Sequence, residues 1–204
     1  MSSDAFINTS FGQVMQIPRS YPVFKREVSN NMYKVTPYFL ALNLVSLMSF
    51  WFYPVLCTIF TFYAYGLPVH TFKALFGWMG ALTLVSFCGS AFGMMWGCIL
   101  TNEITALMLN QMCVVLFNMG SGMMVNTGSS SSFVIKALSW ISPLHYSVEL
   151  LMYRLLDGKN ELLVQEIDSY LGFTYGDTHC YIFLTCFFFV TMFVAWIFIL
   201  QRST

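Results

Sequence analysis

Long apolar segments without charge alternate with short polar stretches along most of this 204-residue chain. After Lys34 no Asp, Glu, Lys or Arg occurs until Lys73, and three further apolar segments follow. A helix needs about 20 apolar residues to cross the ~30 Å hydrocarbon core of a bilayer. The pattern therefore predicts four complete membrane spans, at 35–65, 74–101, 104–125 and 180–200.

The first uncharged segment allows two interpretations. Pro54 lies inside it, whereas Gly66-Leu67-Pro68 stands near its end. One tilted helix kinked at Pro54 is favoured, because the Gly-Leu-Pro triplet is the stronger turn signal. The alternative is a pair of short spans that turn at Pro54.

The N-terminal segment 5–17 is apolar but too short to cross a bilayer alone. It predicts either the last part of a span or an interfacial helix. Pro18 and Pro22 are expected to end this helix, because an internal proline removes a backbone hydrogen bond.

Segment 133–156 predicts helices that do not cross the membrane. Lys136, Glu149 and Arg154 lie within it, and a charge at the centre of a span costs about 2.5–3.5 kcal/mol. A re-entrant or interfacial helical pair, broken at Pro143, fits better.

Polar residues on this segment are expected to be structural. His145 and Glu149 are four residues apart and share one helix face, which favours a local polar pair over a metal site. The acid-rich stretch 157–179 completes one external region over 126–179.

Composition supports a membrane protein. Hydrophobic residues make up 57% of the chain and charged residues 9%, whereas soluble domains carry about 25% charged residues. The net charge of zero gives no basic footprint for nucleic acid. Six cysteines, none in a C-x-x-C motif, are expected to pack as small apolar residues.

Cations concentrate before the first span. Arg19, Lys25, Arg26 and Lys34 lie within sixteen residues, which predicts that the junction 18–34 faces the cytoplasm. Four spans after this junction return the C-terminus to the same side and leave the external region opposite.

Glycines in the second span predict a packing surface. Gly89, Gly93 and Gly97 are spaced four apart, so they line one helix face. Small residues in that register let another helix approach closely. We therefore expect Gly93→Leu to disrupt helix packing.

Three motifs in order resemble the G-subfamily ABC exporters, the White/multidrug half-transporter group with an ABC-2 type membrane domain. Residues 23–40 are similar to that family's "F-x-x-E … Y-R-x-x-x-Y-F-L" motif before its third membrane helix. Residues 121–126 resemble its "S-G-L-L-V-N" end of the fifth helix. Residues 140–149 resemble its "W-x-x-x-S-P-x-R-Y" external helix, although His145 replaces the usual arginine.

The resemblance implies an all-α membrane protein: a polytopic helical bundle of ABC-2 exporter type with four complete spans, a partial N-terminal helix and an external re-entrant helical region. The whole chain, 1–204, would then form one partial ABC-2 type transmembrane domain. The family's first membrane helix and its nucleotide-binding half are expected to be absent from this chain.

The resemblance also implies site residues. The family's substrate-contacting positions, which line a cavity between two membrane domains, correspond to Asn8, Phe11, Gln111 and Val115. Its outward gate of two leucines corresponds to Met123 and Met124. Methionine side chains are more flexible than leucine side chains, so they are expected to seal such a gate less tightly. The junction that couples to the motor corresponds to Arg26, Glu27 and Tyr33.

Catalytic motifs are missing from the sequence. No G-x-x-x-x-G-K-[ST], G-x-S-x-G or H-E-x-x-H occurs, so the chain is expected to be no enzyme and to hold no metal or cofactor. ATP and Mg²⁺ would bind a partner domain.

The predicted function is export of lipophilic substrates across a membrane. The expected partners are a nucleotide-binding ABC domain, a second transmembrane domain, forming a homo- or heterodimer, and membrane lipid. Two alternatives remain open: a non-transporting structural subunit of a larger membrane complex, and a gene fragment of a full half-transporter.

Overall fold

The computed structural model describes residues 1–30, 32–65, 72–122, 133–156 and 176–203. These residues form helices and no strand, which confirms the predicted all-α fold. The helices are α1 (Ser2–Ser29), α2 (Val35–Tyr65), α3 (Phe72–Ile99), α4 (Glu103–Gly120), α5 (Phe133–Ile141), α6 (Pro143–Leu156) and α8 (Asp177–Ser203).

Four of the described helices are long and apolar enough to cross a membrane: α2 over Val35–Ala64, α3 over Leu75–Ile99, α4 over Glu103–Gly120 and α8 over Asp177–Arg202. About two thirds of the α3 window (67%) is buried, against 22–24% for the other three. α3 is therefore the central helix, and the others leave wide apolar faces exposed.

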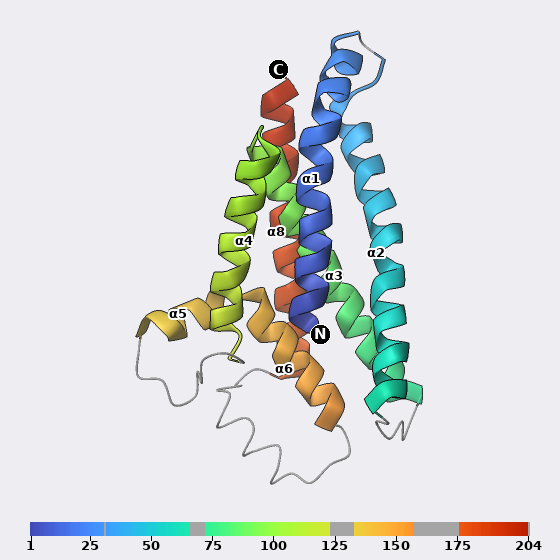
Figure 1. Cartoon of the computed structure of the whole chain (residues 1–204), viewed down its shortest axis with the longest axis vertical. Coiled ribbons are helices and arrows are strands. Elements are labelled where there is room, and N and C mark those ends of the chain that lie inside the picture. The colour runs from blue at the N-terminus through green and yellow to red at the C-terminus, as the bar shows by residue number, and fades with distance from the viewer. Residues whose placement is uncertain (31, 66–71, 123–132, 157–175, 204) are drawn as a thin grey trace.

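The helices run alternately up and down the long axis of the molecule (Figure 1). α2 and α4 run away from the end that holds the α1–α2 connection, and α3 and α8 return to it. The C-terminus therefore lies at the same end as that connection, and α5 and α6 lie at the opposite end. We call these the junction end and the external end.

α1 is longer than predicted, because it continues through both prolines from Ser2 to Ser29. The prediction that Pro18 ends the helix is wrong, and residues 18–29 of the junction are helical. The reason lies in α3: Pro18 is buried, and its Cδ lies 3.5 Å from where a Cβ on Gly97 would stand. Glycine leaves room for the ring, and this packing offsets the cost of about 3 kcal/mol for an internal proline.

The predicted glycine face on α3 is confirmed as a helix–helix interface. A Cβ on Gly93 would lie 2.8 Å from the Cα and carbonyl carbon of Ser10, and one on Gly97 would lie 3.1 Å from Cβ of Ile17. A Cβ on Gly89 would lie 3.0 Å from Cα of Phe6. α1 contacts α3 more extensively than any other described pair of helices contact each other, so this face fixes α1 against the centre of the bundle.

α2 is one helix through Pro54, so the chain does not turn there. The carbonyl of Pro54 accepts a hydrogen bond from Oγ1 of Thr58 at 2.7 Å.

Aromatic rings join four helices of the bundle. The ring centroids of Phe92 on α3 and Phe117 on α4 are 5.4 Å apart. Phe92 also lies 5.8 Å from Phe6 on α1 and 6.1 Å from Phe187 on α8. Ring pairs at such distances contribute about 0.5–1.5 kcal/mol each beyond area burial.

The external helical pair is broken where the sequence predicted. α5 ends at Ile141 and α6 begins with Pro143, where a missing N–H costs little. The hydroxyl of Ser142, between them, donates to the carbonyl of Phe117 at 2.8 Å. This bond fixes the pair to the last turn of α4.

Candidate functional site

The predicted substrate residues lie on exposed faces of two neighbouring helices. Asn8 and Phe11 are exposed on α1, and Gln111 and Val115 are exposed on α4. Phe11 is 46% exposed and Val115 49%. α1 and α4 pack against each other, and the single chain leaves all four of these side chains exposed.

The outer face of α4 carries an apolar stripe. Its members recur three or four residues apart and are all exposed: Ile104, Met108, Met112, Val115 and Met119. The opposite face of α4 packs into the bundle through Ala106, Asn110 and Val114. A helix that is apolar on its outer face suits lipid or another membrane domain.

A buried polar bond joins α1 and α4 behind this surface. Nδ2 of Asn110 donates to Oγ of Ser10 at 3.3 Å, and Asn110 is only 1% exposed. Sequence reasoning missed this residue, although it stands next to Gln111. Buried amides inside membrane bundles mark positions where helices are held in register or where polar solutes pass.

Asn8 has a partner on α2. Its Nδ2 donates to the hydroxyl of Tyr53 at 3.0 Å. Tyr53 also lines a small hollow of about 260 Å³ beside Asp4 and Cys57. Asn8 therefore bridges α1 and α2 while remaining exposed.

The predicted gate, Met123 and Met124, lies outside the described residues. The described part of this segment ends at Gly122, whose φ of 86° is a left-handed conformation that glycine adopts at low cost. The helix α4 ends two residues earlier than Gly122, at Gly120.

The structure brings Glu27 and Tyr33 of the predicted coupling junction together. The hydroxyl of Tyr33 donates to Oε2 of Glu27, while Arg26 is exposed. Burial, and secondly the hydrogen bond to Glu27, raise the pKa of Tyr33 to about 12. Tyr33 stacks on Tyr38 with ring centroids 5.7 Å apart, so the bond ties the end of α1 to the start of α2.

Arg202 is a junction residue that sequence reasoning did not single out. Its Nη1 donates to the carbonyls of Cys98 at 3.1 Å and Leu100 at 3.3 Å. Its guanidinium lies 4.2 Å from the ring centroid of Tyr21, whose hydroxyl donates to the carbonyl of Arg202 at 2.9 Å. A cation at the carbonyl end of α3 is stabilised by the helix dipole.

An exposed ion pair links α1 to α4 at the same end. Nε of Arg19 lies 3.1 Å from Oε2 of Glu103, and exposed pairs contribute about 0–1 kcal/mol. α1 therefore holds contacts to α2, α4 and α8 within its last three turns.

The external end contains a buried polar group. His145 is 2% and Glu149 0% exposed, and Glu149 hydrogen-bonds to the thiol of Cys180. Burial lowers the pKa of His145, and a hydrogen bond with the backbone of Ser121 opposes this. Nearby, Nη2 of Arg154 lies 3.0 Å from Oδ2 of Asp177, which ties α6 to α8.

No metal-ligating cluster of three or more His, Cys, Asp or Glu side chains occurs in the described ranges.

Comparison with known proteins places this geometry in a family. Residues 4–156 match the family model described as the ABC-2 type transporter. The chain is 29% identical over 146 residues to Protein white of Ceratitis capitata and 26% identical over 142 residues to Protein white of Drosophila melanogaster. Each match covers 70% of this chain but only 21% and 20% of those proteins.

The chain therefore belongs to the ABC-2 type transporter family, and the resemblance to the White group is confirmed. It is an integral, multi-pass membrane protein of the class that forms the membrane component of ABC transporters. It spans about a fifth of the length of the curated relatives that it matches.

Proposed function

We propose that this chain is the membrane domain of an ABC-type exporter that moves lipophilic substrates by alternating access. The observation that carries the proposal is the set of exposed side chains on the packed helices α1 and α4, in a chain of the ABC-2 type family. This set combines apolar residues with a few amides, which is the composition of sites for flat lipophilic ligands.

The site needs a second transmembrane domain. Binding pockets bury about 70–90% of a small ligand, whereas Phe11 and Val115 are about half exposed in the single chain. A second domain facing this side would close a cavity over Asn8, Phe11, Gln111 and Val115. Met123 and Met124 would form its outward gate.

Energy for transport would come from a nucleotide-binding ABC domain that holds ATP and Mg²⁺. The junction end suits this role, because Arg26 is exposed there and Glu27 and Tyr33 connect α1 to α2. Movement of a motor against the end of α1 would reach α3 through the glycine face and α4 through Arg19 and Glu103.

The test is ATP hydrolysis by the purified membrane complex in lipid, with and without a panel of lipophilic compounds. The proposal predicts an ATP-binding chain in the complex and hydrolysis that compounds stimulate. Phe11→Ala and Gln111→Ala should weaken the stimulation while basal hydrolysis and assembly persist. A complex that contains only unrelated membrane subunits and hydrolyses no ATP would overturn transport and favour a structural subunit.

A further inference from the structure

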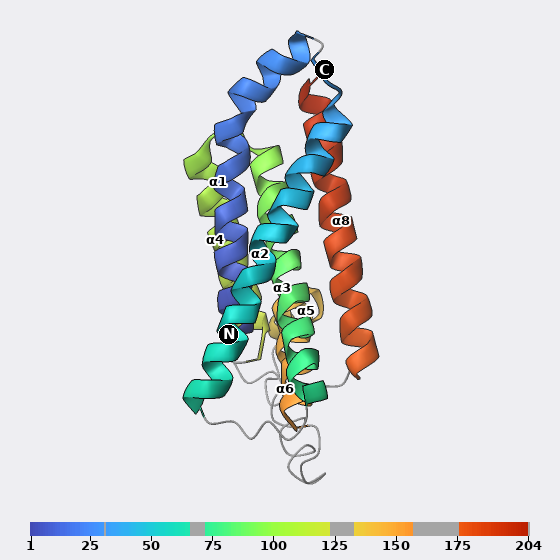
Figure 2. The ribbon, with the colours of Figure 1, turned by 90° about the vertical axis from the view of Figure 1, so that its right-hand side faces the viewer.

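A buried imidazole joins α6 to the end of α4. His145, on α6, is 2% exposed and hydrogen-bonds with the backbone of Ser121, which is 1% exposed where α4 ends. Ser142, the residue before α6, donates to the carbonyl of Phe117 on α4 at 2.8 Å. We call these two bonds the α4–α6 contact. It belongs to the external end of the bundle, where α6 lies in both views (Figures 1 and 2).

The surroundings of this imidazole are apolar. Leu144 and Leu150, on the same helix, are both 0% exposed. Tyr146, next to His145, is 7% exposed and stacks on Phe183 of α8 with ring centroids 3.9 Å apart. A charge placed among such groups loses its water, which is unfavourable unless an opposite charge or several hydrogen bonds replace it.

The charged groups around α6 make their contacts elsewhere. Glu149, one turn after His145, is 0% exposed and hydrogen-bonds to the thiol of Cys180 on α8. Arg154 pairs with Asp177 at 3.0 Å. The carboxyl of Glu149 is therefore directed to α8, whereas the imidazole is directed to α4. On the helices packed against α6, the other titratable side chains in or beside the shared core are Asp4 of α1, Cys88 of α3, Cys113 of α4, and His179 and Tyr181 of α8, together with Tyr146 and Tyr153 of α6 itself.

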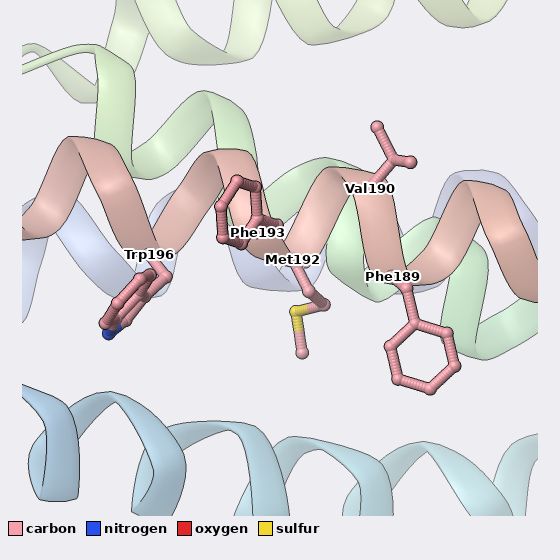
Figure 3. A pocket seen from close by; sticks show the side chains of 5 residues that line it. All are labelled: Phe189, Val190, Met192, Phe193 and Trp196. Carbon is pink, nitrogen blue, oxygen red and sulfur yellow. The ribbon is translucent and has the colours of Figure 1, made fainter.

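The hollow on the surface of α8 offers no comparable group. Figure 3 shows its five lining side chains on that one helix: Phe189, Val190, Met192, Phe193 and Trp196. None of these side chains ionises near neutral pH, so that surface does not respond to protons. Imidazole is the side chain whose charge ordinarily changes in this range.

We propose that His145 is a proton-sensing site: the α4–α6 contact is closed while the imidazole is neutral and opens when the imidazole binds a proton. Opening gives the imidazolium water in place of the apolar neighbours of His145. The proposal depends on the packing of the external end alone, so it holds for a transporter and for a structural subunit. In the predicted topology this end faces away from the cytoplasm, so the medium sensed is the external or luminal one.

The proton dependence has a defined direction. Burial lowers the pKa of His145, and the weaker effect of the bond with Ser121 opposes this. The open contact therefore binds the proton more tightly than the closed one. The closed contact is fully stable above about pH 6.5, the pKa of an exposed imidazole, and loses stability as the pH falls below that value.

Hydrogen exchange read by mass spectrometry tests the proposal on the full chain in lipid nanodiscs, with exposure times corrected for the intrinsic pH dependence of exchange. We expect the amides of residues 118–122 and 144–150 to lose protection on acidification, whereas those of residues 93–98 of α3 keep it. The opening constant should rise by up to about tenfold between about pH 7.5 and 5.5, since one proton is bound. His145→Gln, which remains neutral, should keep the protection of both segments down to the lower pH.

Two matched variants identify the group that titrates. His179→Gln removes an exposed imidazole at the same end and should leave the acid response unchanged. Glu149→Gln removes the buried carboxyl and should also retain the response. A response that persists in His145→Gln, or that disappears in Glu149→Gln or His179→Gln, would overturn the proposal.

A direct titration keeps the proposal testable even if His145→Gln does not fold. The unchanged protein, labelled with ¹³C-histidine, is titrated in detergent micelles by NMR, and the signals of His70 and His179 are assigned from their Gln variants. We expect the signal of His145 to titrate below about pH 6.5, the ordinary value for imidazole. A midpoint at or above that value would show that the closed contact accepts the proton, and the proposal would then be wrong.

Discussion

At the scale of single residues, the junction end depends on a few polar contacts made by side chains far apart in sequence. Tyr33 reaches back to Glu27, and Arg202 reaches from the last helix to the end of α3. Removing either contact should therefore have a measurable effect on the stability of the junction end.

Ionisation of Tyr33 should destabilise the junction at high pH. The pKa of Tyr33 is raised from 10.0 to about 12, so the folded state binds this proton more tightly than the unfolded state. Its stabilising contribution is complete below pH 10, falls as the pH rises from 10 to 12 and is lost above. Thermal unfolding measured across that range should show this loss.

Tyr33→Phe is the matched variant for this titration. It removes the donor to Glu27 and keeps the ring stacking, and should cost about 1 kcal/mol at neutral pH. The difference in tyrosinate absorbance between the two proteins should titrate above pH 10. A difference curve centred at or below 10 would contradict the partly buried, hydrogen-bonded state of Tyr33.

Arg202→Gln should loosen three helices at once. It removes the cation from the carbonyl end of α3 and from the face of Tyr21, at a cost of about 1–3 kcal/mol. Cys98, which is 1% exposed beneath it, should react faster with a maleimide. In Arg202→Lys the reactivity of Cys98 should lie between that of the unchanged protein and that of Arg202→Gln. Lysine keeps the positive charge but lacks the planar guanidinium group with its several N–H donors.

At the scale of elements, the α1–α3 interface orders the bundle. Gly93→Leu should destabilise it by more than about 3 kcal/mol, because the added side chain meets the backbone of Ser10 and no flexible side chain can yield. Gly80→Leu is the matched control on the same helix, because nothing lies within 4 Å of its Cβ position. Detergent thermal-shift assays should separate the two, and equal melting temperatures would show that α1 does not pack on the glycine face.

What the sequence could predict differs between these elements. The glycine spacing on α3 and the break before Pro143 are local patterns. The first predicted a face for close helix packing and the second a break between two helices, and the structure confirms both. The continuation of α1 through Pro18 is not local, because it depends on Gly97 standing opposite. Arg202 likewise has no signal in its own segment, since its partners Tyr21 and Cys98 come from two other helices.

The candidate site was predictable only in part. The family resemblance implied Phe11 and Val115 as site residues, and the structure shows both exposed on adjacent helices. It also shows Asn110 buried against Ser10 one residue before the exposed Gln111, because successive residues point about 100° apart around a helix. The helical register distinguishes them once the packing of α4 is known.

At the scale of the whole molecule, the arrangement of helices turns the charge pattern into a topology. Since α2 is continuous through Pro54, four helices of membrane-spanning length lie between the junction and the C-terminus among the described residues. Both lie at one end of the structure, and α5 lies at the other. The positive-inside rule then predicts that the junction end faces the cytoplasm.

Labelling of single cysteines in sealed, right-side-out membrane vesicles tests this topology, in a background without the six native cysteines. Lys25→Cys and Gln201→Cys should react with an impermeant maleimide only after the vesicles are opened, whereas Lys136→Cys should react in intact vesicles. All three residues are exposed, so differences in labelling report the side of the membrane. If Gln201→Cys and Lys136→Cys label alike, an odd number of crossings separates the junction from the C-terminus, and one of the four helices does not span. If all three patterns are reversed, the bundle is intact but the cations of the junction do not set its orientation.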